Sequence, residues 1–241
     1  MQVIPAAKRF HTDLGWLDSH HVFAFGQHYD PTRVGFGPVR VINDDIVAPG
    51  RGFGAHPHRD MEIVSVVLDG ALAHESSDGS TGVVSAGEVQ FMRAGTGVAH
   101  AEMNASHDAP VHFLQLWLEP RTRGLAPAYH QFRPDMCAGA WTTLGVSADP
   151  AIQPSGQTPE GLFAIDQDVR LSLGHAAAGK ALARHVAPGR AALLYVIAGQ
   201  GQGNETPIAQ GDTLVASEAG RYLLQGDGLQ VLDFDLAADA A

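Results

Sequence analysis

Two short segments carry the residues best able to do chemistry, His56-Pro57-His58 and, further along the chain, His100-Ala101-Glu102. Residues two apart on a β-strand point to the same face. Each segment can therefore aim two side chains into one cavity. If the two strands lie side by side, three imidazoles and one carboxylate converge there, and such a donor set suits a first-row divalent metal ion.

The donor types narrow the chemistry but leave the metal open. Neutral imidazoles and a carboxylate suit Fe(II), and also Zn, Mn, Ni, Co or Cu. The candidate ligands include no cysteine, which argues against a closed structural zinc site. On an octahedral ion this set would leave adjacent positions open, and a vicinal hydroxy-keto or catechol-like substrate and dioxygen can take them.

Composition and charge limit the class of protein. The 241 residues are 45% apolar and 17% charged, which is typical of a globular protein of one domain or two small ones. A formal net charge of −11 argues against direct binding of nucleic acid or an anionic membrane. The single cysteine, Cys137, cannot form an intrachain disulfide. No segment has the pattern of a secretion signal or the length of a membrane span, so we expect a cytoplasmic location.

Many short strands must position these residues. The 28 glycines and 14 prolines are scattered at turn positions, which favours strands over long helices. Residues 63–68 are nearly all apolar and predict a strand that is buried on both faces. Asp69-Gly70 is typical of a hairpin turn, and residues 111–118 predict another strand. We therefore expect residues 1–130, including an N-terminal arm, to form an antiparallel barrel or jelly roll.

The last third of the chain repeats this outline. Val67-Leu68-Asp69-Gly70 matches Val196-Ile197-Ala198-Gly199, and Ser85-Ala86-Gly87-Glu88-Val89 matches Ala209-Gln210-Gly211-Asp212-Thr213. Such self-similarity indicates a duplicated architecture. Anchored on these glycines, the four candidate ligands fall opposite other residues as follows: His56 opposite His185, His58 opposite Ala187, His100 opposite Leu224 and Glu102 opposite Gly226. We thus expect a linker over residues 119–160. The second domain, residues 131–241, is expected to contain the end of this linker and a second barrel without a metal site.

Other candidates have weaker patterns. Several histidines have no partner at metal-ligand spacing, and we interpret them as surface or hydrogen-bonded residues: His11, His20, His21, His28, His74, His107, His112 and His130. The glycine-rich residues 199–203 are followed by neither a helix pattern nor a lysine, so they predict a hairpin turn and not a phosphate loop.

The spacing around the candidate ligands resembles a known pair of motifs. Gly50, His56, His58 and Glu62 follow one cupin signature, and Gly97, His100 and Asn104 follow the other, with Gly95 where proline is usual. The stretches at residues 36–43, 56–62 and 95–102 resemble the pirin family of bicupins, and the resemblance is dense over residues 10–130.

This resemblance implies two consecutive cupin barrels and a mononuclear metal, iron first, bound in the N-terminal barrel by His56, His58, His100 and Glu102. It also implies a quercetin 2,3-dioxygenase-like activity on a flavonol or a related enolisable aromatic, with Glu102 as a catalytic proton acceptor. Its eukaryotic branch acts as nuclear transcription cofactors. The alternative is therefore a metal- or redox-sensing regulatory protein that works through protein contacts. A third possibility is a metal-free sugar isomerase or binding cupin.

Glu62 is left open by the sequence. It has the same parity as His58 and can face the same cavity. The family pattern favours Glu102 as the ligand, so Glu62 is a ligand, a partner that orients an imidazole, or a structural carboxylate.

Overall fold

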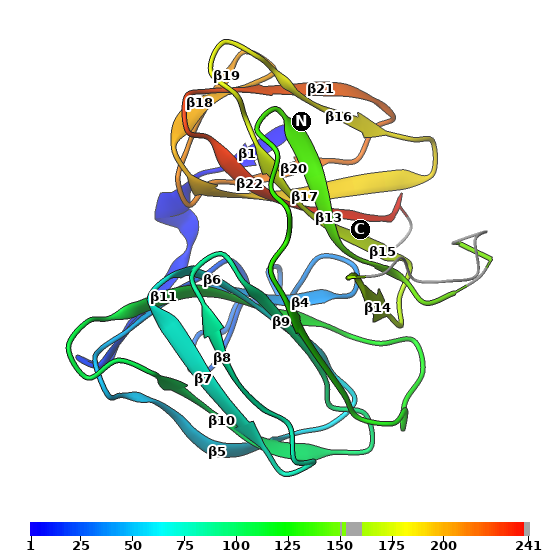
Figure 1. The fold of residues 1–241 in the computed structure, drawn as a ribbon. Helices are drawn as coiled ribbons and strands as arrows, with labels where there is room; N and C mark the ends of the chain where they lie inside the picture. Colours follow the sequence, from blue (N-terminus) through cyan, green and yellow to red (C-terminus); the bar gives the residue numbers. More distant parts are fainter. Residues whose placement is uncertain (150, 153–160, 239–241) are drawn as a thin grey trace. The chain divides into compact units, whose positions relative to one another are not determined.

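Strands make up nearly all of the regular structure (Figure 1). The computed structural model describes residues 1–149, 151–152 and 161–238, and within these ranges the one helical element is a 3-10 turn, η1 (Ala6–Lys8). The chain divides into two compact units, Phe10–Arg133 and Met1–Arg9 with Pro134–Ala241. Each unit contains two sheets, and the predicted all-β fold of two barrels is confirmed.

The first unit pairs a seven-stranded sheet with a four-stranded one. Their strand orders are β12-β9-β6-β11-β4-β3-β2 and β5-β10-β7-β8. The bounds are β2 (Phe10–Asp13), β3 (Leu17–His21), β4 (Val39–Val47), β5 (Gly52–His58), β6 (Glu62–Asp69), β7 (Ala71–Ser76), β8 (Thr81–Ser85), β9 (Val89–Arg93), β10 (Val98–Asn104), β11 (Val111–Leu118) and β12 (Ala128–Phe132).

Apolar side chains from both sheets fill one part of this barrel. Val67, Leu72 and Phe113 are buried in one cluster that joins the two sheets. Fully burying a side chain of this kind contributes about 1.5–3 kcal/mol. Strand β6 is buried over Glu62–Val67, as its apolar sequence predicted.

The expected hairpin turn at Asp69-Gly70 is a corner between the sheets. Strand β6 belongs to the seven-stranded sheet and β7 to the four-stranded one, so the two strands do not pair. Gly70 has φ 74°, and a Cβ there would lie 2.8 Å from the Pro110 carbonyl oxygen. Both features favour glycine at this position. The turn at Asp69-Gly70 was therefore predicted correctly, but β7 is not the hairpin partner of β6.

The second unit has the same architecture. Its seven-stranded sheet has the order β1-β20-β17-β22-β15-β13-β14, and its four-stranded sheet β16-β21-β18-β19. The bounds are β1 (Gln2–Ile4), β13 (Ala140–Ser147), β14 (Phe163–Ile165), β15 (Val169–His175), β16 (Leu182–Val186), β17 (Arg190–Ala198), β18 (Gln200–Gly203), β19 (Thr206–Ala209), β20 (Thr213–Ala216), β21 (Gly220–Gln225) and β22 (Gln230–Ala237).

The turn residues of the two units form equivalent backbone hydrogen bonds. Gly87 N–H to Val67 O and Ala86 N–H to Gly70 O in the first unit correspond to Gly211 N–H to Val196 O and Gln210 N–H to Gly199 O in the second. The repeat that the glycines indicated is therefore a repeat of backbone geometry.

The strand register corrects one part of the repeat alignment. Glu102 pairs with His74, and Leu224 pairs with Gly203. Gly203 follows His74 by as many residues as Gly199 follows Gly70, so Gly203 is the counterpart of His74. Their partners in the neighbouring strands, Leu224 and Glu102, are therefore counterparts too. The expected counterpart, Gly226, is therefore two residues out, because a constant offset cannot allow for the shorter loop of the second unit. In the second unit Tyr222 pairs with Arg184 and Gly220 with Val186, where His100 pairs with His56 and Val98 with His58 in the first. The four positions therefore become Arg184, Val186, Tyr222 and Leu224, because β5 has an extra residue at its bulge.

Three expected boundaries also differ from the structure. Met1–Arg9 lies with the second unit because β1 pairs with β20. The expected linker contains β12, which pairs with β9, and β13, which pairs with β15. Residues 200–203 form strand β18 and not a turn. These strands carry little apolar periodicity, and only pairing with a neighbour reveals them. Part of the expected linker lies outside the described residues.

Candidate metal centre

Strands β5 and β10 bring three of the four predicted ligands together. They are antiparallel neighbours, with His100 directly opposite His56. The ring centroids lie 4.5 Å apart for His56 and His100, 4.8 Å for His56 and His58, and 4.9 Å for His58 and His100. One nitrogen from each ring lies within 4.8 Å of the other two. This spacing suits a common ion with metal–nitrogen bonds of about 2.0–2.1 Å after small side-chain rotations.

Local backbone features make this arrangement possible. Pro57 has no N–H, but β5 is an edge strand, where proline is tolerated. The register shifts between the His100 and Glu102 pairs, which marks a bulge beside the site. At Gly52, an added Cβ would lie 2.3 Å from the Glu102 carbonyl oxygen, so glycine allows β5 to approach β10 closely.

The ring nitrogens can accept a metal ion. His56 Nδ1 lies 2.7 Å from the Gly54 carbonyl oxygen and donates to it, which leaves the lone pair on Nε2. His100 Nε2 is buried without a hydrogen-bond partner among the described residues. Burial, followed by the His56 ring, lowers the pKa of His58 to about 4, and burial with the neighbouring imidazoles lowers the pKa of His100 to about 3. Both rings are therefore neutral at pH 7, as ligation requires.

The Glu102 carboxylate is buried and held by donors from the facing sheet. Gln115 Nε2 donates to Oε2, Gln90 Nε2 donates to Oε1 at 3.0 Å, and Ser65 Oγ lies 3.2 Å from Oε1. Burial raises the pKa of the Glu102 carboxyl, and these three hydrogen bonds oppose the rise. The carboxylate therefore has a fixed orientation and still accepts a proton more readily than an exposed glutamate.

Glu102 is grouped differently from the three imidazoles. One of its oxygens lies within 4.8 Å of ligand nitrogens of His74 and His100, and these three form a second buried group. His100 thus belongs to both groups. The four predicted ligands are therefore divided between two groups, His56 with His58 and His100, and Glu102 with His74 and His100.

His74 is a site residue that the sequence pattern did not single out. It lies opposite Glu102 on β7 and is 3% exposed. Its Nδ1 lies 3.5 Å from Nδ1 of His100. If His100 Nε2 binds a metal, its Nδ1 carries a proton that can be donated to His74, which would fix the ring orientation. The alternation of side chains along β7 could have indicated it, because His74 lies on the buried face of this strand with Leu72 and Ser76.

A row of polar side chains surrounds Glu102. Gln90, Ser65 and Gln115 lie directly opposite one another on β9, β6 and β11. Ser65 Oγ donates to Gln115 Oε1 at 2.8 Å, and Tyr129 Oη donates to Gln90 Oε1 at 3.1 Å. Burial, with the charge of Glu102, raises the pKa of Tyr129 to about 12, so its hydroxyl keeps its proton. In the sequence, this row is indicated by Ser65, a polar residue among the apolar residues of β6.

Glu62 is a structural carboxylate in this structure. It is fully buried and pairs with Arg93, whose Nε lies 2.8 Å from Oε1. The two residues lie directly opposite each other on β6 and β9. No group of potential ligands among the described residues includes Glu62.

Aromatic side chains line one side of the imidazole cluster. The Trp117 ring lies 4.9 Å from the His58 ring at 86°, and Phe53 meets His56 edge-on at 6.5 Å. These rings offer an apolar surface beside the candidate centre. Met92 is fully buried and packs with Ile63, so it belongs to the core.

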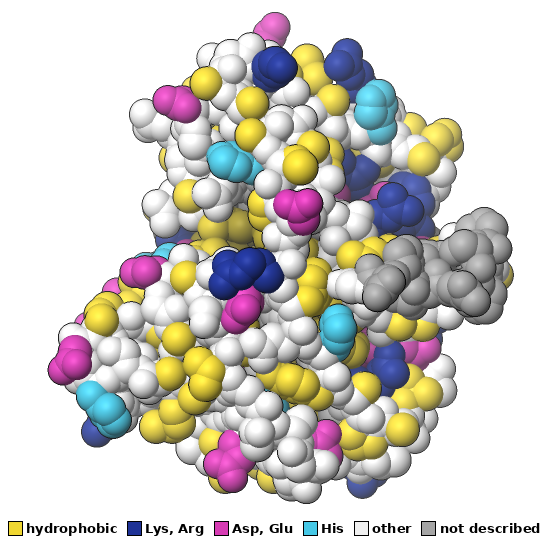
Figure 2. All heavy atoms as spheres, viewed as in Figure 1, with side chains coloured by type: hydrophobic (Ala, Val, Ile, Leu, Met, Phe, Trp, Pro, Cys, Tyr) yellow, Lys and Arg dark blue, Asp and Glu magenta, His cyan; other side chains and the backbone are white. Residues whose placement is uncertain are grey.

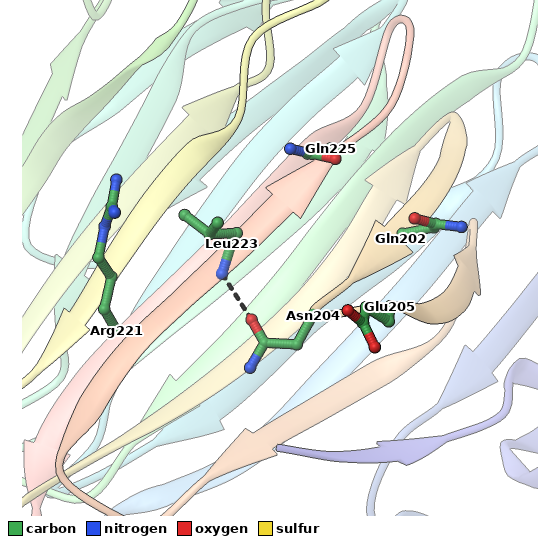
Figure 3. Close-up of a pocket in the computed structure, with 6 residues that line it drawn as sticks. All are labelled: Gln202, Asn204, Glu205, Arg221, Leu223 and Gln225. Carbon is green, nitrogen blue, oxygen red and sulfur yellow. Dashed lines mark hydrogen bonds between the residues drawn. The ribbon is translucent and has the colours of Figure 1, made fainter.

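The second barrel has a polar hollow on the face of β21 (Gly220–Gln225) opposite to its buried residues Tyr222 and Leu224. The hollow has a volume of about 430 Å³, and Asn204 Oδ1 accepts a hydrogen bond from Leu223 N–H beside it (Figure 3). Its other lining residues are Gln202, Glu205, Arg221 and Gln225. The four counterpart positions, Arg184, Val186, Tyr222 and Leu224, have no imidazole, so these residues cannot reproduce the cluster of the first barrel.

Two cupin-type barrels, with an imidazole cluster in the first, place the chain among the two-barrel cupin proteins. The family profile described as Pirin matches residues 3–118, and the one described as Quercetinase C-terminal cupin domain matches residues 154–236. Together with the relatives described next, these matches show that the chain belongs to the pirin family. The resemblance seen in the sequence is thereby confirmed.

Similar proteins extend over the whole chain. A protein named quercetin 2,3-dioxygenase from Escherichia coli K12 is 36% identical over 232 residues, which is 96% of each chain. A protein of the same name from Escherichia coli O157:H7 is 46% identical over 143 residues, 59% of this chain and 62% of its own. The crystal structure of YhhW from Escherichia coli matches with a TM-score of 0.88 and 34% identity over 98% of this chain and 97% of its own. A second YhhW structure is a complex with nickel(II).

Proposed function

We propose that this protein is a metal-dependent dioxygenase that opens a flavonol such as quercetin, or a related enolisable aromatic. The metal would be held by His56, His58, His100 and Glu102. The observation that carries the proposal is the cluster of three imidazoles beside a buried carboxylate, in a chain whose relatives are named quercetin 2,3-dioxygenase. Fe(II) is our first choice of metal, and Zn, Mn, Ni, Co and Cu also suit these donors.

When bound, a first-row divalent ion would supply Lewis acidity and hold substrate and dioxygen in contact. Residues of the chain supply the neutral ligands and the proton acceptor. The low pKa values of His58 and His100 keep both rings neutral and able to bind. Glu102 is suited to accept the proton of a substrate hydroxyl because burial raises its pKa.

The neighbours of these residues supply orientation and an apolar wall. Gln90 and Gln115 hold the two oxygens of Glu102, so the carboxylate cannot rotate freely. Trp117 and Phe53 flank the imidazoles and suit a flat aromatic substrate. The partners we propose are thus a small aromatic molecule and dioxygen.

The proposed function involves neither nucleic acid nor a membrane. On the face shown in Figure 2, Lys and Arg side chains lie among Asp and Glu side chains. With a net charge of −11, this surface does not suit a phosphate backbone. Among the described residues no helix has the length and apolarity to cross a bilayer. We propose a cytoplasmic location, in keeping with the single cysteine.

The decisive experiment is turnover with and without oxygen. Protein treated with chelator and reloaded with Fe(II) should deplete quercetin in air and not under nitrogen, with matching oxygen uptake. The His100→Ala variant should lose at least about 100-fold in rate, since it removes a ligand. The His185→Ala variant changes a lone exposed histidine of the second barrel and should keep full activity. Absence of oxygen-dependent loss of any flavonol, with each of the candidate metals, would overturn the proposal.

A further inference from the structure

A second group of metal-ligand side chains lies on the surface of the first barrel. His11 on β2 and His20 on β3 are directly opposite each other in the antiparallel pair. Asp18 precedes His20 by two residues and therefore shares its face. One ligand atom from each of the three lies within 4.8 Å of the other two. None of these residues belongs to the candidate centre described above.

The Asp18 carboxylate lies beside the ring nitrogens of the two imidazoles. Its Oδ1 is 2.8 Å from His11 Nε2 and 3.7 Å from His20 Nδ1. The two rings stack with centroids 4.5 Å apart and an interplanar angle of 16°. Ligand atoms on one ion, at bond lengths of about 2.0–2.2 Å, lie about 3–3.5 Å apart. Rotation of one ring can close the remaining gap, since the three side chains are 36–52% exposed.

The charges around this group favour a cation. Asp13 lies directly opposite Asp18, and like charges at opposite positions destabilise a strand pair. Asp44 lies opposite His20 on β4 and accepts a hydrogen bond from His112 Nε2 at 2.6 Å. Asp13, Asp18 and Asp44 thus lie on one sheet face with the imidazoles of His11, His20 and His112. A bound dication would offset the repulsion between the carboxylates.

We propose that His11, Asp18 and His20 form a second metal site. Two imidazoles and one carboxylate select a borderline divalent cation, Zn²⁺, Ni²⁺ or Cu²⁺, over Mg²⁺ or Ca²⁺, which prefer oxygen ligands. Water would complete the coordination sphere because the side chains are exposed. This site stands apart from the proposed dioxygenase activity. It implies that each chain binds two ions, the surface ion being the more readily removed by chelators.

The test is a titration of chelator-treated full-length protein with Zn²⁺, with bound metal measured after equilibrium dialysis. The wild-type chain should bind two equivalents. A His11→Asn/His20→Asn double variant should bind one, and a His58→Asn variant should keep the surface equivalent. The matched control is His185→Asn, which removes one exposed histidine outside any ligand group and should still bind two. With His20→Asn alone, the weaker equivalent should lose at least about 10-fold in affinity.

The variants separate failure of this site from failure of the buried centre. If His58→Asn binds no metal, or if the double variant binds as much as the wild type, the surface site is refuted. If the wild type binds one equivalent that the double variant loses and His58→Asn keeps, the surface site holds and the buried centre fails. Two-dimensional NMR of the imidazole protons gives an independent check. Substoichiometric Cu²⁺ should broaden the His11 and His20 signals in His58→Asn, and unchanged signals would refute the site.

Discussion

Replacing Gln115 with leucine tests whether Glu102 is ionised and held inside the first barrel. Gln115 Nε2 donates a hydrogen bond to Oε2 of Glu102. Leucine is close to glutamine in size, so the change opens no large cavity. It removes the bond to Glu102 and also the bond that Gln115 Oε1 accepts from Ser65 Oγ, which is neutral at every pH tested. Hydrogen bonds to charged groups contribute about 1.5–3 kcal/mol, and neutral ones about 0.5–1.5 kcal/mol. The cost of Gln115→Leu should therefore depend on whether the carboxyl is charged.

The direction of the pH dependence follows from the pKa of Glu102. Burial raises this pKa in the folded state above 4.5. The carboxyl's contribution to stability is therefore fully present below the unfolded pKa and is lost as pH rises through the folded pKa. Gln115→Leu removes a hydrogen bond that lowers the pKa of Glu102 in the folded state. The stability lost as pH rises is therefore larger in the variant. We expect the cost of the variant in free energy of unfolding to rise with pH, from about 0.5–1.5 kcal/mol where the carboxyl is protonated to about 1.5–3 kcal/mol where it is ionised.

Urea unfolding of chelator-treated protein measures this difference directly. The matched control is Gln131→Leu, the same chemical change in an amide that donates to the Val83 carbonyl oxygen at 2.8 Å and to Glu88 Oε2 at 3.4 Å and is not bonded to Glu102. Its cost should be the same at pH 5 and pH 8, because it leaves the donors to Glu102 in place. A Gln115→Leu cost that stays constant or shrinks between pH 5 and pH 8 would refute an ionised Glu102 held by Gln115.

Three further substitutions test neighbouring features. Glu62→Gln should leave metal content unchanged and lower the unfolding free energy by about 1–3 kcal/mol, because it weakens the pair with Arg93; loss of metal on dialysis would make Glu62 a ligand after all. Burial raises the pKa of Asp45 to about 7, so its stabilising contribution is lost as pH rises from about 4 through 7. Asp45→Asn should flatten the pH dependence of urea unfolding by at most about 4 kcal/mol, and an unchanged profile would contradict this. Gly95→Ala should lower the melting temperature, since Gly95 has φ 48° and an added Cβ would lie 2.1 Å from the Leu125 carbonyl oxygen; an unchanged value would show that this turn can relax.

Local patterns determined much of the site in advance. His56-Pro57-His58 and His100-Ala101-Glu102 could be assigned to strand faces because side-chain direction alternates along any strand. The glycines at 70, 87, 199 and 211 marked the same corners in both barrels, since each has positive φ. Glu62 could not be assigned in this way. Its parity allowed a ligand role, and only the position of Arg93 on β9 shows that it is paired within the sheet.

What the sequence by itself determined was the all-β class, the repeat and the candidate ligands, because these depend on residue type and on spacing within single strands. The tertiary structure alone decided which strands become neighbours. It placed His74 beside His100, and it set Gln90, Ser65 and Gln115 in one row around Glu102. It also placed His11 opposite His20, beside Asp18, through the pairing of β2 with β3. The physical reason is that strand pairing depends on the free energy of the whole barrel, so contacts between strands distant in sequence leave no local pattern.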